Sequence, residues 1–223
     1  MGDALDKLTI NGFKSIRELK DFELKNLNVL VGANGAGKSN LLSFFKMLHN
    51  LMDGNLAKYV IDNGGISDIL YNGRQTTDKM NFEMFFGDHG YRFTINPTTE
   101  ETPVLSNEAR FYKYGKHEWW MFGDSNDESS LLVKHANGKT HDAIYSKYVY
   151  DKIMSWKVYH FHDTTPRAPM RWGTIVEDNE TLRENASNIA PFLLRLREEH
   201  EAQYQDILNP FLTGLTRMIS TNG

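Results

Sequence analysis

The chain has 223 residues, a formal net charge of −4 and a hydrophobic fraction of 40%. This length fits one large domain or two small ones, and the mild acidity argues against a dedicated nucleic-acid-binding surface. The absence of cysteine excludes disulfides and thiolate metal sites. No apolar run is long enough to span a membrane and no signal-peptide pattern opens the chain, so we expect a cytoplasmic protein with no membrane partner.

Two half-exposed strands are expected before residue 25, because apolar and polar residues alternate there. The alternating apolar residues are Leu8, Ile10, Phe22 and Leu24. The run 27–31 is almost wholly apolar, so we expect a buried strand there. Between the first two strands lies a turn over residues 12–16. From spacing alone, its Lys14 and Ser15 are expected to be solvated.

The glycine-rich motif of the chain follows the expected buried strand. Residues 32–39 match the pattern G-x-x-x-x-G-K-[ST], a loop whose backbone N–H groups wrap around a polyphosphate. A helix beginning near Ser39 is expected, because apolar residues recur at helical spacing as far as Met52. Strand, loop and helix therefore occur in the order that aims a helix N-terminus at an anion. The alternative is a glycine-rich turn that binds nothing.

The residue types of the loop suit a nucleotide bound with Mg²⁺. Lys38 would place a cation on the outer phosphates, and the hydroxyl of Ser39 can ligate Mg²⁺. Glycine at positions 32, 35 and 37 allows backbone conformations and close approach that a Cβ would block.

Downstream of the loop we expect an antiparallel meander followed by helices. The first helix should end near Gly54 and be followed by a helix over 56–61. Further strands are expected at 82–86, 91–95, 109–114, 118–122, 131–135 and 157–161, with turns at 87–90 and 137–138. Further helices are expected at 142–155, after a cap at Ser187, and at 201–208.

Two other constellations have more than one interpretation. His160, His162 and Asp163 lie at the end of an expected strand and could hold a metal ion, but no partner cluster accompanies them. We favour one histidine packing in the core and the other facing the site. Trp119 and Trp120 could stack bases, although core packing is the favoured role for aromatic residues in strands.

The catalytic half of the expected site has no clear match. Hydrolysis needs a carboxylate at the end of a second buried strand and a Glu or Gln that orients the attacking water. No four apolar residues are followed by Asp-Glu; residues 84–88 and 120–124 come closest, and each lacks the second carboxylate. The catalytic residues are therefore missing, supplied by another chain, or of an unfamiliar form.

Residues 12–16 and 27–40 together resemble the SMC/RecF/OLD branch of ABC-type ATPases, which includes RecF-like "AAA family" ATPases of anti-phage defence. Residues 178–183 and 187–193 resemble the segment leading into the helical lobe of that group. The resemblance implies an α/β P-loop NTPase head. Residues 1–165 would form the P-loop lobe with an inserted antiparallel β meander, and 166–223 the start of a helical lobe. It also implies that this lobe is truncated, with the signature loop and the Asp-Glu strand expected after residue 223.

The same resemblance implies ATP and Mg²⁺ as ligands, with two subunits meeting head to tail around two nucleotides as a homodimer. It places Lys14 and Ser15 near the nucleotide and assigns Mg²⁺ to Ser39. His162 and Asp163 occupy the place of a Gln that senses Mg²⁺ and the γ-phosphate. The implied nucleotide contacts are Gly32, Asn34, Gly35, Ala36, Gly37, Lys38, Ser39 and Asn40.

We therefore expect an ATP-binding head that uses MgATP binding and hydrolysis to drive dimerisation, and that acts on DNA or regulates a nuclease effector. The alternative is a regulatory or assembly module that binds ATP without hydrolysing it. A small-molecule or nucleotide kinase is a third possibility. The Asn34-Gly35 pair, the meander and the lack of an Arg-rich lid argue against it.

Overall fold

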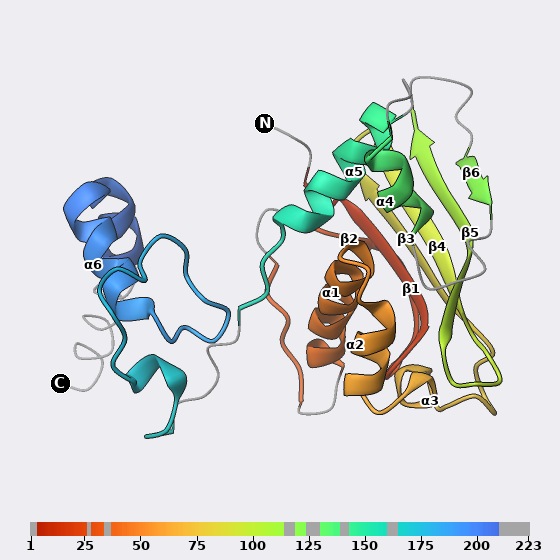
Figure 1. The fold of residues 1–223 in the computed structure, drawn as a ribbon, viewed down its shortest axis with the longest axis horizontal. Helices are drawn as coiled ribbons and strands as arrows, with labels where there is room; N and C mark the ends of the chain where they lie inside the picture. The colour runs from red at the N-terminus through yellow and green to blue at the C-terminus, as the bar shows by residue number, and fades with distance from the viewer. Residues whose placement is uncertain are drawn as a thin grey trace. The chain divides into compact units, whose positions relative to one another are not determined.

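The computed structural model describes residues 4–25, 28–33, 37–113, 119–123, 130–138, 143–159 and 165–209. The chain divides into two compact units, residues 1–156 and 157–223. In the first unit, a six-stranded sheet carries its helices on one face (Figure 1). Within the described residues, no helix has the length and hydrophobicity needed to cross a membrane.

The sheet has the strand order β2-β1-β3-β4-β5-β6, and every neighbouring pair is antiparallel. Its strands are β1 (Lys7–Phe13), β2 (Ile16–Glu23), β3 (Met80–Phe86), β4 (His89–Pro97), β5 (Pro103–Tyr112) and β6 (Trp119–Gly123). Every second residue of β3 is buried, as the period-two pattern predicted. Because β3 pairs with β1, the N-terminal hairpin and the meander form a single sheet.

The helices of the first unit begin with α1, which follows the glycine-rich loop. They are α1 (Lys38–Met52), α2 (Leu56–Asp62), α3 (Ile66–Ile69), α4 (Leu131–Ala136) and α5 (Ala143–Ser155). The predictions for α1 are confirmed at both ends. Gly37 is its N-cap, Asp53 its C-cap, and Gly54 takes a φ of 72° in the turn that follows.

Aromatic rings join α1 to the sheet. Phe44 of α1 stacks on Phe82 of β3 with ring centroids 5.4 Å apart, and both rings meet Phe13 of β1 edge-on. All three side chains are buried, and burying one such ring contributes roughly 1.5–3 kcal/mol. This cluster fixes α1 on the sheet, and with it the position of its first turn.

The prediction of a buried strand at 27–31 is wrong for the residues that can be described. Residues 28–33 form no strand, and the side chains of Val29 and Val31 are 74% and 90% exposed. A buried strand needs backbone partners and cover on both faces. None of the described strands pairs with this run, so its side chains remain exposed.

The predicted strand at 131–135 is wrong as well, because these residues form α4. A short apolar run can form either a strand or a helix, and here the carboxylate of a neighbouring strand favours the helix. The carboxylate of Glu108 accepts hydrogen bonds from the backbone N–H groups of Leu131 (2.8 Å) and Leu132 (2.9 Å). It therefore caps the first turn of α4. The expected hairpin turn at 137–138 is the end of that helix instead.

The second unit contains the 3₁₀ helix η1 (Pro169–Arg171), α6 (Ile189–Glu199) and helical residues 201–209. Asn188, not Ser187, is the N-cap of α6. The buried Asn188 amide donates to the carbonyl oxygens of Asp178 and Thr181 (both 2.9 Å) and accepts from the N–H of Arg183 (2.8 Å). It thereby ties the loop before α6 to the helix. Of the predicted strand 157–161, residues 157–159 form none, and the others lie outside the described residues.

Replacing Glu108 by glutamine tests the cap of α4. Besides the two backbone N–H groups, the carboxylate accepts from the hydroxyls of Tyr91 and Ser130 (both 2.7 Å). In glutamine, an NH₂ group replaces one of the two carboxylate oxygens. Only one acceptor oxygen then remains for the four donors, and the NH₂ group, itself a donor, faces at least one of them. We expect Glu108→Gln to lower the free energy of unfolding by about 2–3 kcal/mol in urea titrations. The control is Glu100→Gln, in an exposed turn. Equal stability of the two variants would contradict the cap.

Candidate functional site

The glycine-rich loop leads into the first turn of α1. Gly37 has a φ of 86°, and among the described residues no side chain caps the helix. The first N–H groups of a helix have no intrahelical acceptor and carry the positive end of the helix dipole. Ser39 is exposed beside them. The start of α1 therefore has the chemistry of an anion-binding helix terminus.

Lys38 folds back over the loop from which it comes. Its Nζ donates hydrogen bonds to the carbonyl oxygens of Gly32 and Ala33, both at 2.6 Å. These bonds join the start of the loop to the start of the helix. An incoming phosphate oxygen would compete with both carbonyls for the same ammonium.

The turn between β1 and β2 packs against the loop. The Asn40 amide donates to Oγ of Ser15 at 2.7 Å. A Cβ on Gly37 would lie only 3.0 Å from the same oxygen. Ser15 and Asn40, which the sequence places 25 residues apart, are thus brought together beside Gly37.

Lys14, the neighbour of Ser15, turns to a different partner. Its Nζ donates to Oδ1 of Asn63 (2.9 Å) at the end of α2 and lies 5.9 Å from the ring centroid of Tyr59. Burial lowers the pKa of the Lys14 ammonium and raises the pKa of the Tyr59 hydroxyl to about 12. The sequence analysis missed Asn63 and Tyr59. Neither belongs to a motif, and both lie more than forty residues from Lys14.

A cavity of about 590 Å³ lies between β2, residues 29–31 and the start of α1. Its volume is within the range of small-molecule sites, and it ends at Gly37 and Lys38. Arg17 and Glu18 of β2 contribute its other charged groups. The apolar part of the lining is Ile16, Leu19, Phe22, Val29, Leu30, Val31 and Leu41.

Several of the expected site residues lie outside the described residues. They are Asn34, Gly35 and Ala36 of the loop, and His160, His162 and Asp163. In the part of the chain that can be described, no three His, Asp or Glu side chains gather as a metal site would require.

A protein-family model described as "AAA domain, putative AbiEii toxin, Type IV TA system" matches residues 27–217, which is most of the chain. The chain belongs to this AAA-domain family. Membership supports a P-loop NTPase α/β fold and a nucleotide-binding, ATPase-like function of the RecF/SMC type, and the antiparallel sheet with its helices is compatible with that fold. The family generally uses a nucleotide with Mg²⁺. No curated protein matches the chain.

Alanine at Gly37 tests the contact with Ser15. A positive φ costs a non-glycine residue roughly 1–2 kcal/mol. We expect Gly37→Ala to lower the free energy of unfolding by more than this amount, because the added Cβ would also press on the Ser15 hydroxyl. Gly54→Ala is the matched control, with a φ of 72° and no heavy atom within 4 Å of its ideal Cβ. The part of this loss that comes from the clash should shrink when Ser15→Ala removes the hydroxyl. A double-mutant cycle of Ser15→Ala and Gly37→Ala measures this coupling. If the stability changes of the two substitutions simply add, the contact between Gly37 and Ser15 is excluded.

Proposed function

We propose that this chain is the ATP-binding head of an ABC-type ATPase of the RecF/OLD kind. The observation that supports it is the combination at the start of α1: an uncapped helix N-terminus, the Lys38 ammonium and the exposed Ser39 hydroxyl, in a chain of an AAA-domain family. Each group matches one part of MgATP. Helix N–H groups bind phosphate oxygens, the lysine neutralises the outer phosphates, and the hydroxyl ligates Mg²⁺.

On this proposal, nucleotide binding begins with an exchange at Lys38. The ammonium leaves the carbonyl oxygens of Gly32 and Ala33 and takes the β- and γ-phosphates as acceptors. Asn40 and Ser15 hold the first turn of α1 against the β1–β2 turn during this exchange. The cavity beside β2 then lies where the nucleoside can extend from the phosphates.

We further propose that MgATP drives association of two copies, which act on DNA or regulate a nuclease effector. The exposed apolar run beside the loop supports an association surface near the nucleotide, because contiguous exposed apolar residues mark interaction sites. Val29 and Val31 carry most of this exposed area.

A second candidate is an assembly module that binds ATP without hydrolysing it. It is favoured by the cavity beside the loop, where the only carboxylate among the described lining residues is the exposed Glu18. Hydrolysis needs carboxylates that hold Mg²⁺ and orient water. Phosphate release that disappears in Lys38→Ala would identify the ATPase, whereas Lys38-dependent binding without phosphate release would identify the module.

The phosphate loop itself is tested by thermal melts with and without MgATP. A ligand at about a hundred times its dissociation constant adds roughly 2.7 kcal/mol, which raises Tm by several degrees for a chain of this size. We expect this rise in the native chain and its loss in Lys38→Ala.

The matched control for this melt is Lys46→Ala, which removes a lysine from the same helix two turns further on. It should retain the rise. An equal rise in all three proteins would show that MgATP binds elsewhere, and no rise in the native chain would contradict the proposal.

A further inference from the structure

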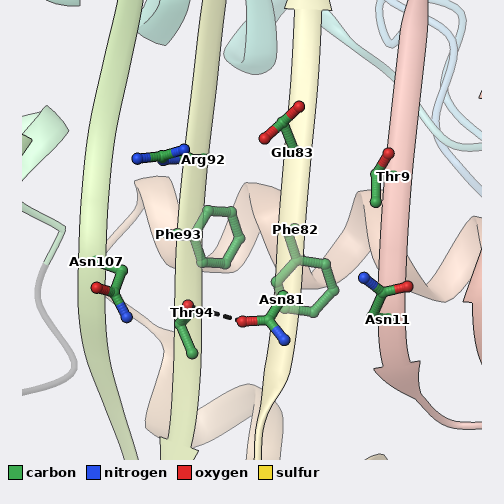
Figure 2. Close-up of a pocket in the computed structure, with 9 residues that line it drawn as sticks. All are labelled: Thr9, Asn11, Asn81, Phe82, Glu83, Arg92, Phe93, Thr94 and Asn107. Carbon is green, nitrogen blue, oxygen red and sulfur yellow. Dashed lines mark hydrogen bonds between the residues drawn. The ribbon is translucent and has the colours of Figure 1, made fainter. Parts of the chain in front are cut away.

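The two faces of the sheet differ in their chemistry. Figure 2 shows the amide side chains of Asn11, Asn81 and Asn107 on one face and the ring of Phe82 on the other, where it stacks on Phe44 of α1. Apolar packing of this kind holds the helix on the sheet but has no direction. Hydrogen bonds add direction, and the described residues supply them to α1 from the β1–β2 turn and from α2.

Lys14 stands in the β1–β2 turn, in a conformation that its neighbours hold in place. Its φ is 50°, in the left-handed region that residues other than glycine rarely adopt. Its backbone N–H donates to the carbonyl oxygen of Ile69 at 2.7 Å, and the N–H of Tyr71 donates to the carbonyl oxygen of Gly12 at 2.9 Å. The backbone of the turn is thus tied to residues 69–71, which limits the directions open to the Lys14 side chain.

The Lys14 side chain reaches the C-terminal end of α2. Its Nζ donates to Oδ1 of Asn63, the C-cap of that helix, at 2.9 Å, and lies 5.9 Å from the ring centroids of both Phe13 and Tyr59. The negative end of a helix dipole and the faces of aromatic rings both attract a cation. The ammonium is therefore already bound where it stands, and turning to a phosphate would break these contacts.

Asn63 and Tyr59 continue this connection to α1. The Asn63 amide donates to the carbonyl oxygen of Tyr59 at 2.9 Å, and the Tyr59 hydroxyl donates to the carbonyl oxygen of Ser43 in α1 at 3.0 Å. In the β1–β2 turn, Ser15 accepts from Asn40 in the first turn of α1 at 2.7 Å. The contacts therefore lead from the first turn of α1 through the hairpin and α2 back to α1.

We propose that Lys14, Asn63 and Tyr59 form a clamp that positions the first turn of α1, and that Lys14 acts through Ser15 without contacting the phosphates. The three side chains are positioning residues. A helix start that is already ordered binds an anion without a further ordering cost, so the clamp should raise the affinity for the phosphates of MgATP. This effect on binding rests on the proposed function, whereas the ordering of the first turn does not.

The first measurement is backbone amide hydrogen exchange of the full chain without nucleotide. Its reporters are Asn40 and Leu41, whose N–H groups donate to the carbonyl oxygen of Gly37. We expect these two amides to exchange about fivefold faster in Lys14→Met and in Asn63→Ala, because the first turn of α1 loses its restraint. Amides of α5 serve as the internal reference, since a global loss of stability would speed exchange there as well.

The matched control for this exchange experiment is Asn55→Ala. Asn55 lies at the opposite end of α2, where it is exposed and its side chain forms no cap hydrogen bond. The substitution therefore changes an asparagine of the same helix without touching the clamp. Exchange at Asn40 and Leu41 should stay as in the native chain.

The second measurement is the dissociation constant of MgATP by isothermal titration calorimetry. On the proposal, Lys14→Met and Asn63→Ala each weaken binding about tenfold, and the double variant is no weaker than either, because both break the same clamp. Asn63→Asp keeps an acceptor for the ammonium, so its affinity should remain close to that of the native chain.

A direct contact between Lys14 and the phosphates predicts a different pattern. Lys14→Met would then weaken binding, Asn63→Ala would not, and Asn63→Asp would weaken it by retaining the ammonium. This pattern would overturn the proposal, as would unchanged exchange of Asn40 and Leu41 in both clamp variants. Faster exchange at these amides in a chain that binds no MgATP would support the clamp and contradict the proposed function.

Discussion

The attachment of α1 to the sheet is the constraint on which the proposed nucleotide site depends. Phe44 lies between the sheet and the helix and is held by Phe13 and Phe82 from two strands. A helix fixed in this way has a defined first turn, and its N–H groups can bind an anion without first becoming ordered. The chemistry of the glycine-rich loop therefore rests on three aromatic rings that contain no catalytic group.

The hairpin of β1 and β2 further restrains the position of α1, because its turn forms hydrogen bonds with α1 and with the end of α2. Ser15 meets the first turn of α1 through Asn40, and Lys14 meets the end of α2 through Asn63. Backbone hydrogen bonds also join this part of the chain to the end of α3 and the residues after it. The Lys14 N–H donates to the carbonyl oxygen of Ile69, and the Tyr71 N–H donates to the carbonyl oxygen of Gly12. A movement of the loop on nucleotide binding would thus be transmitted to the hairpin, α2 and the edge of the sheet.

Local patterns predicted much of the fold and the loop-to-helix part of the site. The helix start at Gly37 and Lys38 and the alternation in β3 follow from rules that act over a few residues. The secondary-structure predictions were wrong where partners far away in the sequence determine the local structure. The apolar run at 28–31 forms no strand because no described strand pairs with it, and residues 131–135 form a helix because Glu108 caps them. The sequence alone likewise could not predict the partners of Lys14 or the amide side chains on one face of the sheet. These residues come together only through β pairing and helix packing.

The central claim is that the loop at the start of α1 holds the phosphates of MgATP. Backbone amide hydrogen exchange measured with and without MgATP tests it most directly, because it reports where protection appears. We predict slower exchange of amides in residues 32–41 and faster or unchanged exchange in the exposed turn at 98–101, with no change in the loop for Lys38→Ala. Protection confined to other parts of the chain, or a loop that exchanges equally with and without MgATP, would contradict the account.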